Sequence, residues 1–149
     1  MYMEQILIFP AGTGRACAHA TAHLKQHGIA VTDQPSSDVT HLLLDVPTKE
    51  VPISLLDQLS KHVTVIGGNL HLRDQNTIDL LQNEAYLVRN AAITAECAVQ
   101  VAMEHIGYVL HGCEVLIIGW GRIGKYLASL LKKIGCRVSV AVRNPKDKA

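Results

Sequence analysis

A glycine-rich turn between an apolar strand and an amphipathic helix is the feature that most constrains this chain. Its glycines are Gly119, Gly121 and Gly124, in G-x-G-x-x-G spacing. The preceding apolar run 115–118 is rich in β-branched residues and too short for a buried helix, which indicates a strand. A second apolar run at 137–142 completes a predicted βαβ unit. The helix between the strands is indicated by apolar residues on one face and a glycine stop, at Ile123, Leu127, Leu130, Ile134 and Gly135.

This context is typical of a turn that binds a dinucleotide. The first glycine permits the sharp bend, the second lets the backbone approach a pyrophosphate, and the third lets the helix pack closely on the strand. Free N–H groups at the helix start would point at the phosphates. A purely structural βαβ turn is the alternative, since glycine-rich turns are common. The predicted cofactor contacts in this turn are Gly119, Trp120, Gly121, Arg122, Ile123 and Gly124.

The residues after the second strand indicate which dinucleotide would bind. An acidic residue about 20 positions beyond the motif would accept hydrogen bonds from the ribose of NAD. This chain has Arg143 and Asn144 there instead, with Lys146 close behind. Because a guanidinium suits a 2′-phosphate, the sequence predicts NADP, with Arg143 and Asn144 as contacts. A solvated basic segment is the alternative interpretation.

Composition and charge argue against several classes of partner. The 14 Lys and Arg residues nearly balance the 13 Asp and Glu residues, so we expect no nucleic-acid or membrane partner. The four cysteines are scattered without a C-x-x-C pair, which is typical of reduced thiols in a cytoplasmic protein. His19, His23 and His27 share a helical face but lack a further ligand, so we expect a solvated stripe and no metal site.

Residues 1–90 alternate short apolar runs with helical stretches. This pattern favours an α/β fold with a parallel sheet and right-handed crossovers, and we expect a flavodoxin-like substrate domain. Its last elements are predicted as a helix at 77–82 and a strand at 86–88. Thr13 and Arg15 follow the first strand and are candidates to hold an anionic substrate. A surface turn and helix cap is the alternative for these two residues.

A long helix is predicted from Asn90, a favoured N-cap residue, to about Tyr108. Most of its surface is apolar, which is typical of a helix buried on several sides. We interpret residues 91–110 as a connecting helix. Residues 111–149 would then be the first βαβ unit of a dinucleotide-binding Rossmann domain that is incomplete, because a complete domain has two such halves.

Over essentially its whole length the chain resembles the family of dipicolinate synthase A subunits. The resemblance is densest from Asn90-Ala91-Ala92-Ile93-Thr94-Ala95-Glu96, through the long helix, to the run Ile118-Gly119-Trp120-Gly121-Arg122-Ile123-Gly124. It implies NADP-linked oxidation of dihydrodipicolinate, a small dicarboxylate, to dipicolinate in a sporulating bacterium. It also implies that the partner is the B subunit of dipicolinate synthase. By analogy, Asn90, Thr94 and Glu96 would line the interdomain cleft near the nicotinamide. Alternatively they form an N-cap and a first helical turn.

Other functions stay open from the sequence. The layout is also similar, more distantly, to D-2-hydroxyacid and alanine dehydrogenases, and a non-catalytic NADP-binding or assembly module is a third possibility. No general base stands out, so the catalytic residues are unknown. Because half of the nucleotide domain is missing, we expect a fragment that is impaired as an enzyme. We also expect its two-stranded part to pair with another copy as a homo-oligomer such as a dimer, by swapping or edge addition.

Overall fold

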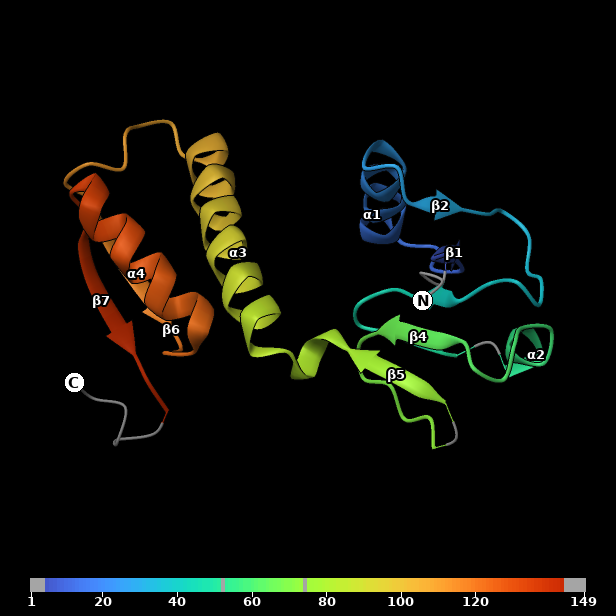
Figure 1. Cartoon of the computed structure of the whole chain (residues 1–149). Coiled ribbons are helices and arrows are strands. Elements are labelled where there is room, and N and C mark those ends of the chain that lie inside the picture. Colours follow the sequence, from blue (N-terminus) through green and yellow to red (C-terminus); the bar gives the residue numbers. More distant parts are fainter. Residues whose placement is uncertain (1–4, 52, 74, 144–149) are drawn as a thin grey trace. The chain divides into compact units, whose positions relative to one another are not determined.

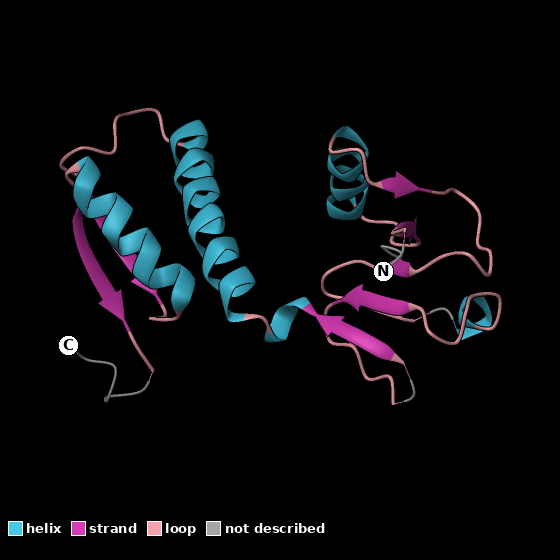
Figure 2. Ribbon diagram, viewed as in Figure 1, coloured by secondary structure: helices cyan, strands magenta, loops and turns pink. Residues whose placement is uncertain are grey.

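The computed structural model describes residues 5–51, 53–73 and 75–143. The chain divides into two compact units, Met1–Glu84 and Ala85–Ala149. The division falls one residue after the start of the long helix, whose other residues belong to the second unit. Figures 1 and 2 show the elements of each unit.

The first unit is a parallel sheet with helical crossovers. Its strands are hydrogen-bonded in the order β2-β1-β3-β4-β5, and every pairing is parallel. This is the flavodoxin-like order, so the predicted fold class is confirmed. The elements are β1 (Leu7–Pro10), α1 (Arg15–Gln26), β2 (Ala30–Val31), β3 (His41–Leu43), α2 (Ile53–Leu56), β4 (Thr64–Gly67), β5 (Asn76–Asp79) and the 3-10 helix η1 (Leu80–Gln82).

The core of the first unit lies on the two middle strands. Leu42 of β3 and Val65 of β4 are partners in the parallel register, and both are completely buried. Val39 and Val63 join the same apolar cluster. Burying one such side chain stabilises the fold by about 1.5–3 kcal/mol. The carboxyl ends of these strands are therefore held firmly, and the loops that follow them are fixed in place.

Asp79 orders the turn that follows β4. Its carboxylate accepts hydrogen bonds from the backbone N–H groups of Asn69, Leu70 and Leu81, at 3.2, 3.1 and 2.9 Å. Asn69 has a left-handed backbone at φ 60°, which asparagine tolerates better than most residues. Desolvation works to raise the pKa of Asp79, but the three N–H donors and the nearby His71 together lower it.

We expect this turn to lose stability in acid. Since folding lowers the pKa of Asp79, the carboxylate stabilises the fold above its unfolded pKa of about 3.9, and the contribution disappears as the pH falls through the folded pKa. Asp79→Asn keeps the shape without the charge. Its free energy of unfolding should therefore depend less on pH than that of wild type between about pH 2 and 5. Urea unfolding followed by circular dichroism measures this, and equal pH dependence would contradict it.

The second unit places a long helix and a βαβ unit together. Its elements are α3 (Glu84–His105, beginning one residue before the division), β6 (Glu114–Ile118), α4 (Arg122–Ile134) and β7 (Arg137–Ala141). The two strands are parallel, with Glu114 opposite Arg137. Ala128 and Leu131 of α4 are buried against Ile117 of β6 in a second apolar cluster. The helix ends at Ile134, and the predicted stop, Gly135, is its C-cap with a left-handed backbone at φ 97°.

Two predicted elements near the end of the first unit are wrong. Residues 77–82, expected to be a helix, form the end of β5 and then η1, which Asp79 caps through Leu81 N. Residues 86–88, expected to be a strand, lie in the first turns of α3. Glu84 in the first turn favours a helix start there, because a carboxylate complements the positive end of the helix dipole. Asn90 is therefore inside the helix and is not its N-cap.

Candidate functional site

The glycine turn after β6 has the geometry that its spacing predicts. Gly119 has φ 107°, in the left-handed region that favours glycine, and its N–H donates to Ala141 O at 2.8 Å. Gly121 is the N-cap of α4. A Cβ on Gly124 would lie 2.5 Å from Gly119 O, so only glycine lets the helix approach the turn this closely. Gly119 thus allows the bend, Gly121 forms the N-cap, and Gly124 allows close packing of the helix on the turn.

The start of α4 has features that suit an anion. Its N-cap, Gly121, makes no side-chain capping hydrogen bond, and the described first turn of the helix has no acidic residue. Space also remains beside the turn, since a Cβ on Gly121 would meet no atom within 4 Å. The first N–H groups of a helix carry the positive end of its dipole, which suits a phosphate.

This helix start opens into a pocket of about 600 Å³ within the second unit. Its walls come from α3, from β6 and from the first turns of α4. The pocket brings Asn90 of α3 together with five of the six residues predicted in the turn: Gly119, Gly121, Arg122, Ile123 and Gly124. Arg122 is the only charged residue among the described residues that line it. The pocket is therefore largely apolar, with a cation at the helix start.

Other predicted cofactor residues lie elsewhere. Trp120 is partly buried and packs against the apolar cluster of the second unit, so its side chain supports the turn. Arg143 is exposed just beyond the end of β7. Asn144, like Lys146, lies outside the described residues. Of the two residues predicted to contact a 2′-phosphate, the structure therefore describes Arg143 and does not describe Asn144.

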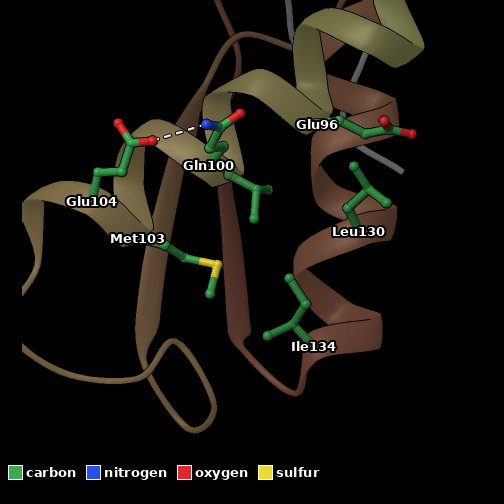
Figure 3. A pocket seen from close by; sticks show the side chains of 7 residues that line it. Glu96, Gln100, Met103, Glu104, Leu130 and Ile134 are labelled. Carbon is green, nitrogen blue, oxygen red and sulfur yellow. Dashed lines mark hydrogen bonds between the residues drawn. The ribbon is translucent and has the colours of Figure 1, made fainter.

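Two of the three residues predicted on the long helix do not reach the pocket. Thr94 Oγ1 donates to Asn90 O at 2.7 Å, a bond within the helix. Glu96 lines a different depression between α3 and α4, where Gln100 Nε2 donates to Glu104 Oε1 at 2.8 Å (Figure 3). The reason is that α3 starts at Glu84, so Thr94 and Glu96 lie in its middle and not in its first turn.

In the first unit, Asp45 occupies the position where an anion would bind at the start of α1. Its carboxylate accepts hydrogen bonds from Thr13 N at 2.9 Å and from Gly14 N at 3.0 Å. A Cβ on Gly14 would lie 2.6 Å from Asp45 Oδ1. Cys17 is buried where a dinucleotide motif would have its third glycine, and burial raises the pKa of its thiol. This loop therefore binds its own carboxylate in place of a phosphate.

A larger depression of about 790 Å³ surrounds this loop. Thr13 and Arg15 lie on it together with Thr48 and Lys49 from the loop after β3. Thr48 Oγ1 donates to Asp45 O at 2.7 Å and accepts from Gly68 N at 3.1 Å, which links this loop to the end of β4. The depression carries two cationic residues, Arg15 and Lys49, and two acidic ones, Asp45 and Glu50. The sequence analysis missed the role of Asp45, although an acid just after the apolar run 42–44, together with Gly12 and Gly14 in the loop after the first strand, is a usable signal.

The chain has similarity to proteins of known sequence and structure. No family model matches it. The A subunit of dipicolinate synthase from Bacillus subtilis is 26% identical over 97 residues, which cover 60% of this chain and 33% of that protein. The crystal structure of the same B. subtilis protein superposes with a TM-score of 0.68 at 16% identity, covering 98% of this chain and 63% of that one. The chain is similar to the A subunit of dipicolinate synthase.

Two further solved structures agree on the fold. The A subunit of dipicolinate synthase from Bacillus halodurans superposes with a TM-score of 0.72 at 17% identity, over 95% of this chain and 64% of that one. A pyruvate reductase of Chlamydomonas reinhardtii gives a TM-score of 0.50 at 17% identity, over 95% and 53% of the two chains. The predicted resemblance to the dipicolinate synthase A subunits is therefore confirmed. The chain spans about a third of the curated relative and less than two thirds of these solved chains.

Among the helices that the structure describes, none has both the length and the apolar character needed to cross a membrane.

Proposed function

We propose that this chain is part of an NADP-dependent oxidoreductase that is similar to the A subunit of dipicolinate synthase. In this proposal the oxidoreductase oxidises dihydrodipicolinate to dipicolinate during sporulation. The observation that carries the proposal is the uncapped start of α4, which opens into a pocket at a turn of three glycines. Such a turn suits the pyrophosphate of a dinucleotide. The similarity in sequence to the dipicolinate synthase protein of B. subtilis supports the choice of reaction.

In this proposal the substrate is a small dicarboxylate. Thr13 and Arg15, on the depression around Asp45, would hold a carboxylate together with Lys49. Asn90 would contact the nicotinamide end of the cofactor from α3, because it lines the same pocket as the glycine turn. Thr94 and Glu96 are left out, since neither lies on that pocket. The chain would work in the cytoplasm with the B subunit of dipicolinate synthase.

Arg143 provides the test of the cofactor. A guanidinium that binds a 2′-phosphate contributes about 1.5–3 kcal/mol, which corresponds to about a tenfold to hundredfold change in Kd. Arg143→Ala should therefore weaken NADP binding by about this factor and leave NAD binding unchanged. Isothermal titration of both dinucleotides measures it. Lys133→Ala, an exposed cation in the last turn of α4, is the control and should change neither affinity. Tighter binding of NAD than of NADP by the unmodified chain would contradict the choice of cofactor.

One observation favours a second candidate, a binding module without catalysis. The described residues lining the pocket offer no carboxylate, histidine or thiol that could move a proton. Turnover of freshly prepared dihydrodipicolinate with NADP by the full-length protein, compared with turnover by this chain, separates the two. Dinucleotide binding without turnover would support the module, whereas no binding at all would contradict both candidates.

We also propose that the chain associates with a second copy through the second unit. Two strands make a marginal sheet, and neither outer edge of β6 or β7 is paired within the described residues. Leu116 and Ile118 of β6 are 62% and 87% exposed on the same side of the strand, where they also line the pocket beside the glycine turn. Such apolar exposure is typical of an interaction surface.

We expect a dimer by light scattering, with slow amide exchange over residues 114–142. Ile118→Lys should convert it to a monomer, because a charge would have to be buried at the contact. Ile53→Lys, at a side chain 70% exposed in the first unit, is the matched control and should stay dimeric. A monomeric wild type with strong protection over residues 114–142 would contradict self-association.

A further inference from the structure

We propose that Cys113 and Cys136 form a dithiol site that a low-molecular-weight disulfide such as oxidised glutathione converts to an intramolecular disulfide. The site lies at the amino ends of β6 and β7. It uses neither the glycine turn nor the loop around Asp45, so it does not depend on the proposed function.

The backbone brings the two cysteines next to each other. Glu114 and Arg137 are the first partners in the parallel register of β6 and β7, and each cysteine directly precedes one of them. Gly112 N donates to Gly135 O at 3.0 Å, and Arg137 N donates to Cys113 O at 2.8 Å. Neighbouring strands lie about 4.7–4.9 Å apart. Disulfides join Cα atoms about 4.4–6.8 Å apart, so this spacing suits one.

The two thiols also face the same segment. Cys113 Sγ donates to Val109 O, and Cys136 Sγ donates to Leu110 O, both at 3.1 Å. Because these carbonyls belong to consecutive residues, both sulfur atoms lie beside one short stretch of backbone. Both cysteines are free. To bond to each other, the two sulfurs would have to turn away from these carbonyls.

The two thiols differ in exposure, which sets the order of the reaction. Cys136 is only 8% exposed and belongs to the apolar cluster, whereas Cys113 is partly exposed. The Cys113 thiolate would attack the small disulfide and release one small thiolate. The Cys136 thiolate would then attack the Cys113 sulfur and release the second. Two protein thiols are oxidised and one small disulfide is reduced to two thiols, which take up the two protons from the cysteines.

Closing this bond would tie the start of β6 to the start of β7. The bond encloses the whole of β6, the glycine turn and α4, and a closed loop of this length restricts the unfolded chain strongly. We expect the midpoint of thermal unfolding of the second unit to rise by about 5–15 °C. Trp120 is the single tryptophan of the chain and packs in this unit, so its fluorescence follows the transition.

The experiment treats the full chain with oxidised glutathione and maps its peptides without reduction. A cross-link between the peptides of Cys113 and Cys136, with a loss of two hydrogens and the rise in midpoint, would support the proposal. Cys113→Ser should abolish both effects, while the control Cys97→Ser, at an exposed cysteine of the same unit, should preserve them. Dithiothreitol should reverse both. Glutathione adducts without a cross-link, or cross-links only between chains, would overturn it.

Discussion

Gly124→Ala is expected to unfold the second unit at a much lower urea concentration than wild type. The new Cβ would lie 2.5 Å from Gly119 O, a backbone atom that cannot rotate away. Gly119 is itself held by its bond to Ala141 O, so α4 would have to shift from the strand and disturb its core contacts at Ala128 and Leu131. Overpacking of this kind costs about 1–3 kcal/mol of unfolding free energy. Urea titration followed by Trp120 fluorescence measures the loss.

Two other glycines provide the controls. Gly107→Ala places its Cβ in open space at a residue without positive φ, so the unfolding free energy should change by less than about 0.5 kcal/mol. Gly121→Ala also meets no atom, but it puts a methyl group beside the proposed phosphate site. It should keep the stability of wild type and weaken dinucleotide binding. A Gly124→Ala chain as stable as Gly107→Ala would refute the packing role of Gly124.

The fold was predictable where short-range sequence pattern and packing agree. Each parallel strand in the core is a short β-branched or leucine run, and the glycine spacing marked the turn into α4 correctly. The pattern failed at residues 77–82, whose apolar spacing fits a helix. In the structure this segment begins within β5, the edge strand that pairs with β4. It failed again at 86–88, since a tyrosine, leucine and valine run is typical of a strand, although here the long helix continues through it. Tertiary context overrode local propensity at both places.

The candidate site was predictable only in part for a similar reason. Spacing can locate a glycine turn, because its backbone conformation depends on residues close in sequence. It cannot show that Trp120 packs into the core while its neighbours line a pocket. The role of Asp45 depends on a contact with Gly14, 31 positions earlier, which follows from the pairing of β1 with β3. A local sequence pattern does not reveal such long-range pairing.

The bond between Asp45 and the start of α1 gives the second large expected effect. Asp45→Ala would leave the N–H groups of Thr13 and Gly14 without their carboxylate and should cost about 1.5–3 kcal/mol of unfolding free energy. Gly14→Ala should also destabilise, because its Cβ would lie 2.6 Å from Asp45 Oδ1. Circular dichroism during urea unfolding measures both, and amide exchange over α1 locates the loss. Asp57→Ala, at an exposed aspartate of the same unit, should be neutral.

The double variant separates the two causes. If Gly14→Ala destabilises the fold because its Cβ clashes with the Asp45 carboxylate, then removing that carboxylate also removes the clash. The loss in the Gly14→Ala, Asp45→Ala chain should therefore be smaller than the sum of the single losses by about 0.5–3 kcal/mol, as expected for residues in contact. Strictly additive losses would mean that Gly14 is required for another reason.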